Sequence, residues 1–318
     1  MKPLVSIVCI TYNHAPYIRQ AIENMVNQET DFDFEIIVHD DCSTDGTTDV
    51  VREFAEKYPD IIKPIIREKN IYSQGKNILQ PLYELAQGEY IASCEGDDYW
   101  CDNTKLQKQV DYMRNNPECS LVIHNGYLID EETAEKSLIN PYNKDKILSG
   151  EEVIVKMKAI PPTASMLFKR SYITTMPEFF LNAGVGDQTK RMYLMLKGHV
   201  YYMNDAMCVY RFNVPGSFTE RVKKNEDQRK RSFDKMIKFF QNYDEYTNQK
   251  YHKAIELVIS REYFGYYLRR NEKIKAYKTE YFKQTYSLKE RIVKWVAIAV
   301  PSSLKRKLKS IKNSLSKD

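Results

Sequence analysis

Short apolar runs and stretches of helical periodicity alternate along about the first 130 residues of the chain. A run such as Phe34–His39 predicts a buried strand, because most of its side chains are apolar and turn-forming residues follow it. The segment from Pro16 to Gln28 instead places its apolar side chains on one face of a helix. This alternation predicts βαβ units around a mostly parallel sheet. Strands are expected at 4–10, 34–39, 61–66 and 90–94, and helices at 16–28, 50–58, 78–86 and 106–113.

The alternation weakens beyond residue 130. Residues 131–146 are polar enough to predict a mobile loop over a binding cleft. Ser149 and Glu152 form a capping-box pattern, which predicts the start of a helix that continues through Lys158. Strands are also expected at 121–129 and 163–168, and a helix at 187–197.

The pattern changes near residue 221, where long helical stretches rich in Lys, Arg, Glu and Tyr replace the strands. We therefore expect an α/β domain over residues 1–220 and a helical C-terminal region over residues 221–318. The end of this region, residues 288–318, combines a helical apolar face with many cations and few acids. Such a pattern is typical of an amphipathic helix on an anionic membrane surface. The alternatives are a helix that packs on the domain or on another subunit, and a basic tail without a partner.

Composition narrows the class of protein. With 318 residues and 42% hydrophobic side chains, the chain can bury a substantial core. The net charge of +5 is small beside 48 basic and 43 acidic side chains, so the total does not indicate a nucleic-acid partner. Six cysteines without a CxxC pair are typical of reduced thiols. No apolar run approaches about 18 residues, so a membrane-spanning helix is not expected. From the cysteines and the basic amphipathic end together, we expect a cytoplasmic protein that binds the inner face of the cell membrane peripherally.

Three carboxylates, Glu95, Asp97 and Asp98, directly follow the predicted strand at 90–94. In an open α/β sheet, ligands bind at the edge where the strands end. Carboxylate oxygens at this density suit Mg²⁺ or Mn²⁺, which proteins often share with the phosphates of a substrate. Gly96 would let the backbone approach such a ligand closely. The pattern predicts a metal–phosphate site; its alternative is a solvated turn or a helix cap.

A second acidic loop, residues 40–47, follows the predicted strand at 34–39 with the sequence Asp-Asp-Cys-Ser-Thr-Asp-Gly-Thr. Parallel strands deliver the loops that follow them to the same sheet edge. One cleft could therefore hold a base and ribose at this loop and a metal-bound diphosphate at the loop of Asp97.

Three segments, in this order, resemble the successive motifs of family 2 glycosyltransferases: Val5–His14, Asp40–Thr47 and Gly88–Trp100. The resemblance covers about residues 3–215. It implies an inverting enzyme with a GT-A fold, which is a Rossmann-like nucleotide-binding sheet with flanking helices, here followed by a helical C-terminal extension. It also implies a nucleotide-sugar donor and a divalent metal, Mn²⁺ or Mg²⁺.

The resemblance assigns the nucleotide side of the site to two segments. Thr11 and Asn13 correspond to motif positions beside the nucleotide. Asp41, with Asp40 as its neighbour, corresponds to a position that contacts a uracil-type base. This correspondence favours a UDP-sugar as the donor.

The segment Glu95-Gly96-Asp97 stands where the family has its DxD metal motif. Asp97 is therefore the predicted metal ligand. Its neighbour Asp98 is predicted either to support the metal site without touching the metal or to contact the sugar. Glu95 replaces the usual Asp, which keeps the charge but lengthens the side chain. Its predicted contact is with the ribose or with the metal.

Asp187 lies in the region of the family's catalytic base, although the usual Glu-Asp pair is Gly186-Asp187 here. Capping of a helix is the alternative role for Asp187. Residues 188–192 keep only the Gln and the Arg of the QxxRW signature of processive members, which favours a non-processive enzyme. Arg211 resembles a position after the base and is a candidate contact for the diphosphate or the acceptor; its alternative is a surface salt bridge.

The resemblance predicts transfer of a hexose from a UDP-sugar to a hydroxyl of a saccharide or lipid-linked acceptor in cell-surface polysaccharide synthesis. Asp187 would take the proton of the attacking hydroxyl, and a cation at Asp97 would stabilise the leaving diphosphate. A sugar-phosphate nucleotidyltransferase is one alternative, but its Gly-rich loop is expected where this chain has Thr11–His14. The other is a catalytically silent, membrane-associated nucleotide-sugar-binding protein, because Glu95 and the residue before Asp187 depart from the family pattern.

Overall fold

A computed structural model of the chain describes residues 2–139, 142–156, 162–181, 183, 186–217 and 225–299. Contacts between residues divide the chain into two compact units, residues 1–239 and 240–318. The predicted domain boundary at residue 220 lies outside the described residues and stays a prediction.

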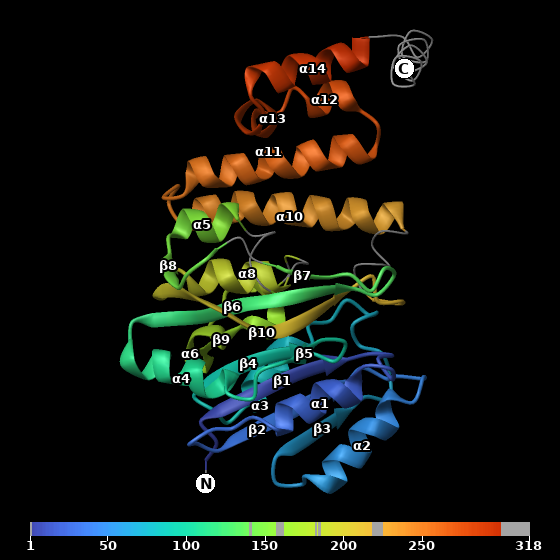
Figure 1. Ribbon diagram of the computed structural model, residues 1–318, viewed down its shortest axis with the longest axis vertical. Coiled ribbons are helices and arrows are strands. Elements are labelled where there is room, and N and C mark those ends of the chain that lie inside the picture. Colours follow the sequence, from blue (N-terminus) through green and yellow to red (C-terminus); the bar gives the residue numbers. More distant parts are fainter. Residues whose placement is uncertain are drawn as a thin grey trace, which may run out of the picture. The chain divides into compact units, whose positions relative to one another are not determined.

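A mixed β-sheet forms the centre of the first unit (Figure 1). Its strands are β1 (Val5–Thr11), β2 (Phe34–Asp40), β3 (Ile62–Ile66), β4 (Tyr90–Glu95), β5 (Tyr99–Trp100), β6 (Cys119–Asp130), β7 (Lys136–Leu138), β8 (Lys146–Leu148), β9 (Leu167–Lys169) and β10 (His199–Phe212). Strands β3, β2, β1 and β4 are neighbours in that order and run parallel. Beyond them, β9 pairs antiparallel with both β4 and β6, and β10 runs parallel to β6. The sheet is therefore parallel where the acidic loops leave it.

Four helices follow the first strands along the chain: α1 (Ile18–Val26), α2 (Thr47–Lys57), α3 (Leu79–Leu85) and α4 (Lys105–Asn115). Helix α1 lies beside α2 next to the parallel strands (Figure 1). Its apolar face packs into the same buried cluster as Ile7 of β1 and Ile36 of β2. The buried side chains of α1 are Ile18, Ala21, Ile22 and Met25. This is the helical spacing that predicted α1, so the core explains why the segment is a helix.

The predicted βαβ order is confirmed from β1 to α4, apart from the short strand β5, which was not predicted; further along, two predictions need correction and one strand was missed. The predicted mobile loop at 131–146 contains β7 and the start of β8, which pair with β6 and β10. The predicted strand at 163–168 begins only at Leu167, after a short 3-10 turn. Strand β10 was not predicted, because Asn204 and Asp205 interrupt its apolar pattern.

Shorter helices occupy the later part of the first unit. The predicted capping box is confirmed, because the Glu152 N–H donates to the Ser149 hydroxyl while the Ser149 N–H donates to the Glu152 carboxylate, both at 3.1 Å. The helix was predicted to continue through Lys158, but it ends at Val155, with Lys156 as its C-cap. Residues 157 and 158 themselves lie outside the described residues. The helices are α5 (Gly150–Val155), α6 (Arg170–Ile173), α7 (Glu178–Leu181) and α8 (Gly186–Leu194).

The second unit is helical over its described residues. Helix α10 (Glu226–Tyr246) crosses the division between the units and is followed by α11 (His252–Arg269), α12 (Lys273–Ala276), α13 (Glu280–Thr285) and α14 (Leu288–Ala299). Phe264, Ala276 and Phe282 form a small buried cluster ringed by tyrosines. Among the described helices, none combines the length and the apolar character needed to cross a bilayer. Residues 300–318 of the predicted membrane-binding segment lie outside the described part of the chain.

Candidate active site

The two acidic loops lie side by side at the carboxyl ends of β2 and β4. Strand β1 lies between these strands and pairs with both along its length. Each loop is also bonded to the end of β1: the Asp41 N–H donates to the Thr11 carbonyl at 3.1 Å, and the Gly96 N–H donates to the Ile10 carbonyl at 2.9 Å. The predicted meeting of the two loops at one sheet edge is confirmed.

Asp40 and Asp41 are buried and use their carboxylates to shape the first loop. Asp40 accepts from the backbone N–H of Ser43 at 3.0 Å, from the Ser43 hydroxyl at 2.5 Å and from the hydroxyl of Thr48. The two oxygens of Asp41 accept from the backbone N–H groups of residues 71 and 72 at 2.8 and 3.0 Å. These bonds fix the loop beside the predicted base position, and the base contact of Asp41 stays a prediction.

Asn13 and His14 connect the end of β1 to the first acidic loop. Asn13 has a left-handed backbone with φ of 55°, a conformation that Asn tolerates better than most residues. Its N–H donates to the Ser43 hydroxyl at 2.9 Å, and its Oδ1 accepts from the Thr44 N–H at 2.8 Å. The His14 N–H donates to the Thr47 hydroxyl at 2.8 Å. The segment that holds the predicted nucleotide residue Asn13 is thus tied to the loop of Asp41.

Gly96 and Asp98 hold the second loop against the protein. A Cβ atom on Gly96 would lie only 2.6 Å from the Thr11 hydroxyl oxygen, so the close approach of the loop to β1 requires glycine. Asp98 is fully buried, and its Oδ1 accepts from the Arg211 N–H at 3.0 Å. Its Oδ2 has no hydrogen-bond partner among the described residues. Burial, followed by the charges of the two neighbouring acids, raises the pKa of Asp98 well above its usual range.

Negative charge is crowded around Glu95. Burial, and then the charges of Asp97 and Asp187, raises the pKa of Glu95 to about 8, while the nearby cation of Lys190 opposes this shift. The structure therefore brings the predicted base Asp187 close enough to the acidic loop for the two to interact electrostatically. The part of this rise that comes from the neighbouring carboxylates is the part that a bound cation would offset.

A divalent cation at Asp97 fits this arrangement. The described residues contain no closed set of three acidic, His or Cys ligands. Mg²⁺ and Mn²⁺ suit a site with one or two carboxylates, because substrate phosphates and water can supply the other ligands. The crowded charge at Glu95 and the unpartnered Oδ2 of Asp98 are the features that a cation would relieve.

Arg211, whose side chain is 10% exposed, holds the acidic loop through its guanidinium. Its Nη1 donates to the Asp97 carbonyl at 2.7 Å and its Nη2 to Gln20 Oε1 at 2.5 Å, and its Nε lies 3.1 Å from Glu131 Oε1. The guanidinium also lies over the rings of Tyr17 and Tyr99, at 4.9 and 4.7 Å. All three nitrogens thus contact protein groups, and the predicted contact of Arg211 with diphosphate or acceptor stays a prediction.

Asp187 lies in the first turn of α8, with about a third of its side chain exposed (33%). Its Oδ2 forms an ion pair with Arg191 at 2.7 Å, one helical turn further along. Burial alone would raise the pKa of Asp187, but Arg191 and Lys190 outweigh it and hold this pKa below its usual value. The side chain is therefore a carboxylate at neutral pH, oriented by the cation of Arg191.

Sequence reasoning missed Lys190 and His14. Lys190 is buried on α8, and its Nζ lies 3.2 Å from the Tyr83 hydroxyl. Nothing local in the sequence marks it, because its position near Glu95 depends on how α8 packs. Nε2 of His14 lies 3.7 Å from Asp97 Oδ2. Its place directly after the motif residue Asn13 was a usable signal.

A family model described as "Glycosyl transferase family 2" matches residues 6–176, more than half of the chain. The chain belongs to this family. The match contains both acidic loops, and it confirms the family resemblance inferred from their motifs.

Relatives of this family 2 chain agree with that assignment. An uncharacterized protein of Mycobacterium tuberculosis (strain ATCC 25618 / H37Rv) is 33% identical over 225 residues, which are 69% of this chain and 63% of that protein. The chain thus spans under two thirds of that relative's length. The UDP-Glc:alpha-D-GlcNAc-diphosphoundecaprenol beta-1,3-glucosyltransferase WfaP of Escherichia coli is 32% identical over 130 residues, 41% of this chain and 48% of WfaP.

A solved structure shares the fold. The mannosyltransferase PcManGT from Pyrobaculum calidifontis, in complex with GDP-Man and Mn²⁺, superposes with a TM-score of 0.59 at 17% identity and covers 100% of this chain and 81% of PcManGT. The predicted α/β fold of the GT-A type, with helices at the C-terminal end, is confirmed.

Proposed function

We propose that the chain is an inverting, non-processive, metal-dependent glycosyltransferase that moves a hexose from a UDP-sugar to an acceptor hydroxyl. The observation that carries this proposal is the meeting of two acidic loops at the end of β1, one suited to a nucleotide and one to a metal-bound diphosphate. Membership of glycosyl transferase family 2 supports the reaction class.

The donor would lie across the two loops. Thr11, Asn13 and Asp41 would contact the nucleoside, with Asp40 keeping the loop in shape through Ser43. Asp97 would hold Mn²⁺ or Mg²⁺, an assignment supported by the Mn²⁺ in the complex of PcManGT. When bound, the cation neutralises the charge that grows on the leaving diphosphate.

The remaining polar groups would orient the donor. Glu95 would face the ribose or the cation, and Asp98 would stay behind the loop, held by the Arg211 N–H. Arg211 would keep the Asp97 backbone in place and reach the diphosphate or the acceptor only by exchanging one of its present partners.

Asp187 would act as the general base. Its lowered pKa keeps it ionised at neutral pH, so it is ready to accept the proton of the attacking hydroxyl. A carboxylate with a lowered pKa is a weaker base, and the ion pair with Arg191 would have to loosen as the proton arrives. Attack from the side opposite the leaving group would invert the anomeric centre.

The acceptor would be a saccharide or a lipid-linked saccharide in cell-surface polysaccharide synthesis. The name of WfaP states a diphosphoundecaprenol-linked acceptor for that relative. We extend this to a cytoplasmic protein at the inner membrane face, with residues 288–318 on the anionic surface.

Mn²⁺-dependent release of UDP from candidate UDP-sugars tests the reaction and separates an enzyme from a silent binder. The Asp187→Asn variant should bind UDP as the unaltered chain does, while its turnover falls about 10²- to 10⁴-fold. Turnover that survives this substitution would remove Asp187 from the role of base. Absence of UDP release with every donor and acceptor would contradict the proposed activity.

A further inference from the structure

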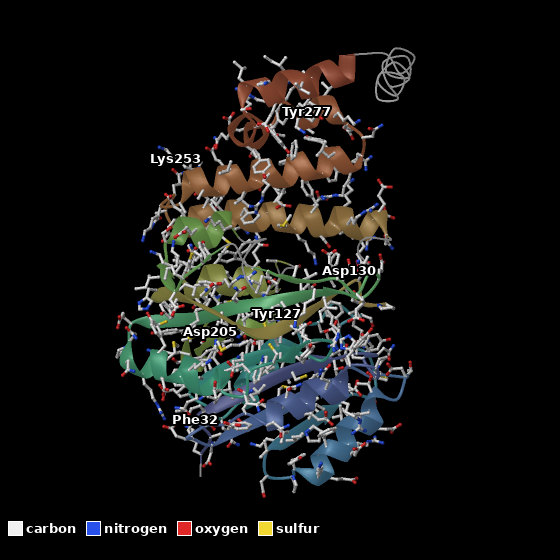
Figure 2. All side chains as sticks on the ribbon, in the orientation of Figure 1. Phe32, Tyr127, Asp130, Asp205, Lys253 and Tyr277 are labelled. Atoms are coloured by element: carbon white, nitrogen blue, oxygen red, sulfur yellow. The ribbon has the colours of Figure 1, made fainter. Side chains whose placement is uncertain are left out.

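A groove of about 440 Å³ lies within the second unit, between α13, α14 and the two residues that follow α12. Aromatic rings form its floor: Tyr277, which directly follows α12 and is labelled in Figure 2, stacks on Phe282 at 4.5 Å and meets Trp295 edge-on at 5.6 Å. Phe282 is fully buried, so this floor is part of the packed core of the unit. The groove is therefore built from α13, α14 and the turn that follows α12.

Cations stand at the rim of this groove. Lys278, Lys283 and Arg291 line it together with the apolar side chains. Over residues 270–295 the chain carries eight Lys or Arg and three Glu side chains. The net positive charge predicts attraction for an anionic partner.

Arg291 adds a second indication of an anion. Its Nε is buried and has no hydrogen-bond partner within the described part of the chain. A buried N–H without a partner costs free energy, and a shift of the Arg291 side chain towards a phosphate oxygen in the groove would satisfy it. This observation is independent of the total charge.

Apolar side chains extend from the groove along the exposed face of α14. Leu288 and Ile292, both of which line the groove, are 66% and 54% exposed, and Val293 is 60% exposed. Trp295, at the same helical face as Leu288 and Ile292, is 36% exposed. Other large apolar side chains of the described chain are as exposed, such as Leu85 and Leu138, but these four lie together on one helix, and such a gathering marks a surface that binds something apolar.

We propose that this groove binds the phosphate headgroup of an anionic phospholipid, with Leu288 and Ile292 in the acyl boundary of the same leaflet. Arg291 would donate to the phosphate, and Lys278 and Lys283 would lie at the headgroup level. The inference deepens the proposed membrane association and rests on that part of the proposed function, but it does not depend on the glycosyl-transfer chemistry.

Charge and exposure together favour a lipid over other occupants. Soluble phosphate or an acidic peptide would use the cations but leave Leu288 and Ile292 in water. A second copy of the chain could cover the apolar face, but it would bring the same excess of cations against these cations. A bilayer containing anionic lipid satisfies both the apolar face and the cations.

The chain offers matched control residues for a vesicle sedimentation test. Ile292 and Ile274 are 54% and 53% exposed in the same unit, but only Ile292 lines the groove. Arg291 and the exposed Lys253 of α11 (Figure 2) each contribute one positive charge, and only Arg291 lines the groove. The probes are vesicles of phosphatidylcholine alone and of phosphatidylcholine with 30% phosphatidylglycerol. Donor hydrolysis by the same full-length variants is measured in solution without vesicles.

The full-length chain should bind the anionic vesicles and not the neutral ones. Ile292→Ser and Arg291→Gln should each weaken this binding about fivefold or more, while Ile274→Ser and Lys253→Gln leave it within about twofold. Equal losses of vesicle binding within each pair would overturn the proposal of a lipid site in the groove, because the general charge or apolar content of the chain would then explain the binding. A dimer that Ile292→Ser alone dissociates would also overturn it. Donor hydrolysis should be the same in all four variants; if it is absent throughout while the binding pattern holds, the proposed chemistry fails and the lipid site stands.

Discussion

The Gly96→Ala substitution tests how tightly the loop of Asp97 packs against β1. The Cβ of Gly96→Ala would lie 2.6 and 2.7 Å from Oγ1 and Cβ of Thr11, and 3.0 Å from Cδ1 of Ile18. Thr11 and Ile18 are 3% and 0% exposed, so neither side chain can turn away into solvent. Carbon atoms prefer contacts of about 3.5 Å or more, so the loop must move by about 1 Å.

This displacement has a cost in stability and a cost in function. Overpacking of a buried position costs about 1 to 3 kcal/mol in the free energy of unfolding, which urea denaturation measures. Asp97 is the next residue, so a shift of about 1 Å would carry the proposed metal ligand with it. Misplacement on that scale can reduce turnover about 10²-fold, and UDP-release kinetics would report the loss.

Gly186→Ala is the matched control. A Cβ at Gly186 would meet no described residue within 4 Å, and its backbone is not left-handed. Because Gly186 begins α8, alanine there should leave stability unchanged or raise it by up to about 1 kcal/mol. If Gly96→Ala were as stable and as active as the unaltered chain, the argument for a tightly seated loop would be refuted.

Three further predictions concern single side chains. Arg211→Lys should weaken Mn²⁺-dependent UDP binding about tenfold in calorimetry, because one ammonium cannot bridge the Asp97 carbonyl and Glu131 as the guanidinium fork does. Ser149→Ala should lower the free energy of unfolding by about 1 kcal/mol in urea, because α5 loses its N-cap. Lys105 is fully buried, and burial lowers its pKa to about 7. Above pH 7 the folded state releases a proton that the unfolded chain keeps, so the stability of the unaltered chain rises with pH. Lys105→Met should lack this rise. The difference in unfolding free energy, variant minus unaltered chain, should therefore fall by about 1 to 2 kcal/mol from pH 7 to 9.

Each of these has an outcome that would contradict it. Unchanged UDP affinity in Arg211→Lys would mean that the fork is not needed to place the loop. An unaltered urea midpoint for Ser149→Ala would mean that the cap contributes nothing to α5. A stability difference for Lys105→Met that stays constant between pH 7 and 9 would show that Lys105 keeps its proton when buried.

The parallel half of the sheet and its two acidic loops were predictable from sequence. Each apolar run ends abruptly in carboxylates and turn formers, and parallel pairing then forces the ends of β2 and β4 to one edge. The capping box at Ser149 was predictable for a similar reason, because both of its partners lie within four residues. Local patterns carry information about local contacts.

Contacts between distant segments could not be predicted in this way. The Arg211 N–H bonds to Asp98, 113 residues earlier, only because β10 pairs with β5 and β6. Strands β7 and β8 are three residues long and form only where neighbours already offer an edge. Lys190 comes close to Glu95 through the packing of α8, which no spacing in the sequence encodes.

Calorimetric titration of UDP with and without Mn²⁺ tests the central claim most directly. The unaltered chain should bind UDP at least about tenfold more tightly with Mn²⁺, and Asp97→Asn should remove that gain. Asp205→Asn, which changes a carboxylate that is 62% exposed on β10 (Figure 2), should keep the gain. If Mn²⁺ strengthened UDP binding equally in all three proteins, the account of a metal–diphosphate site at the Asp97 loop would be contradicted.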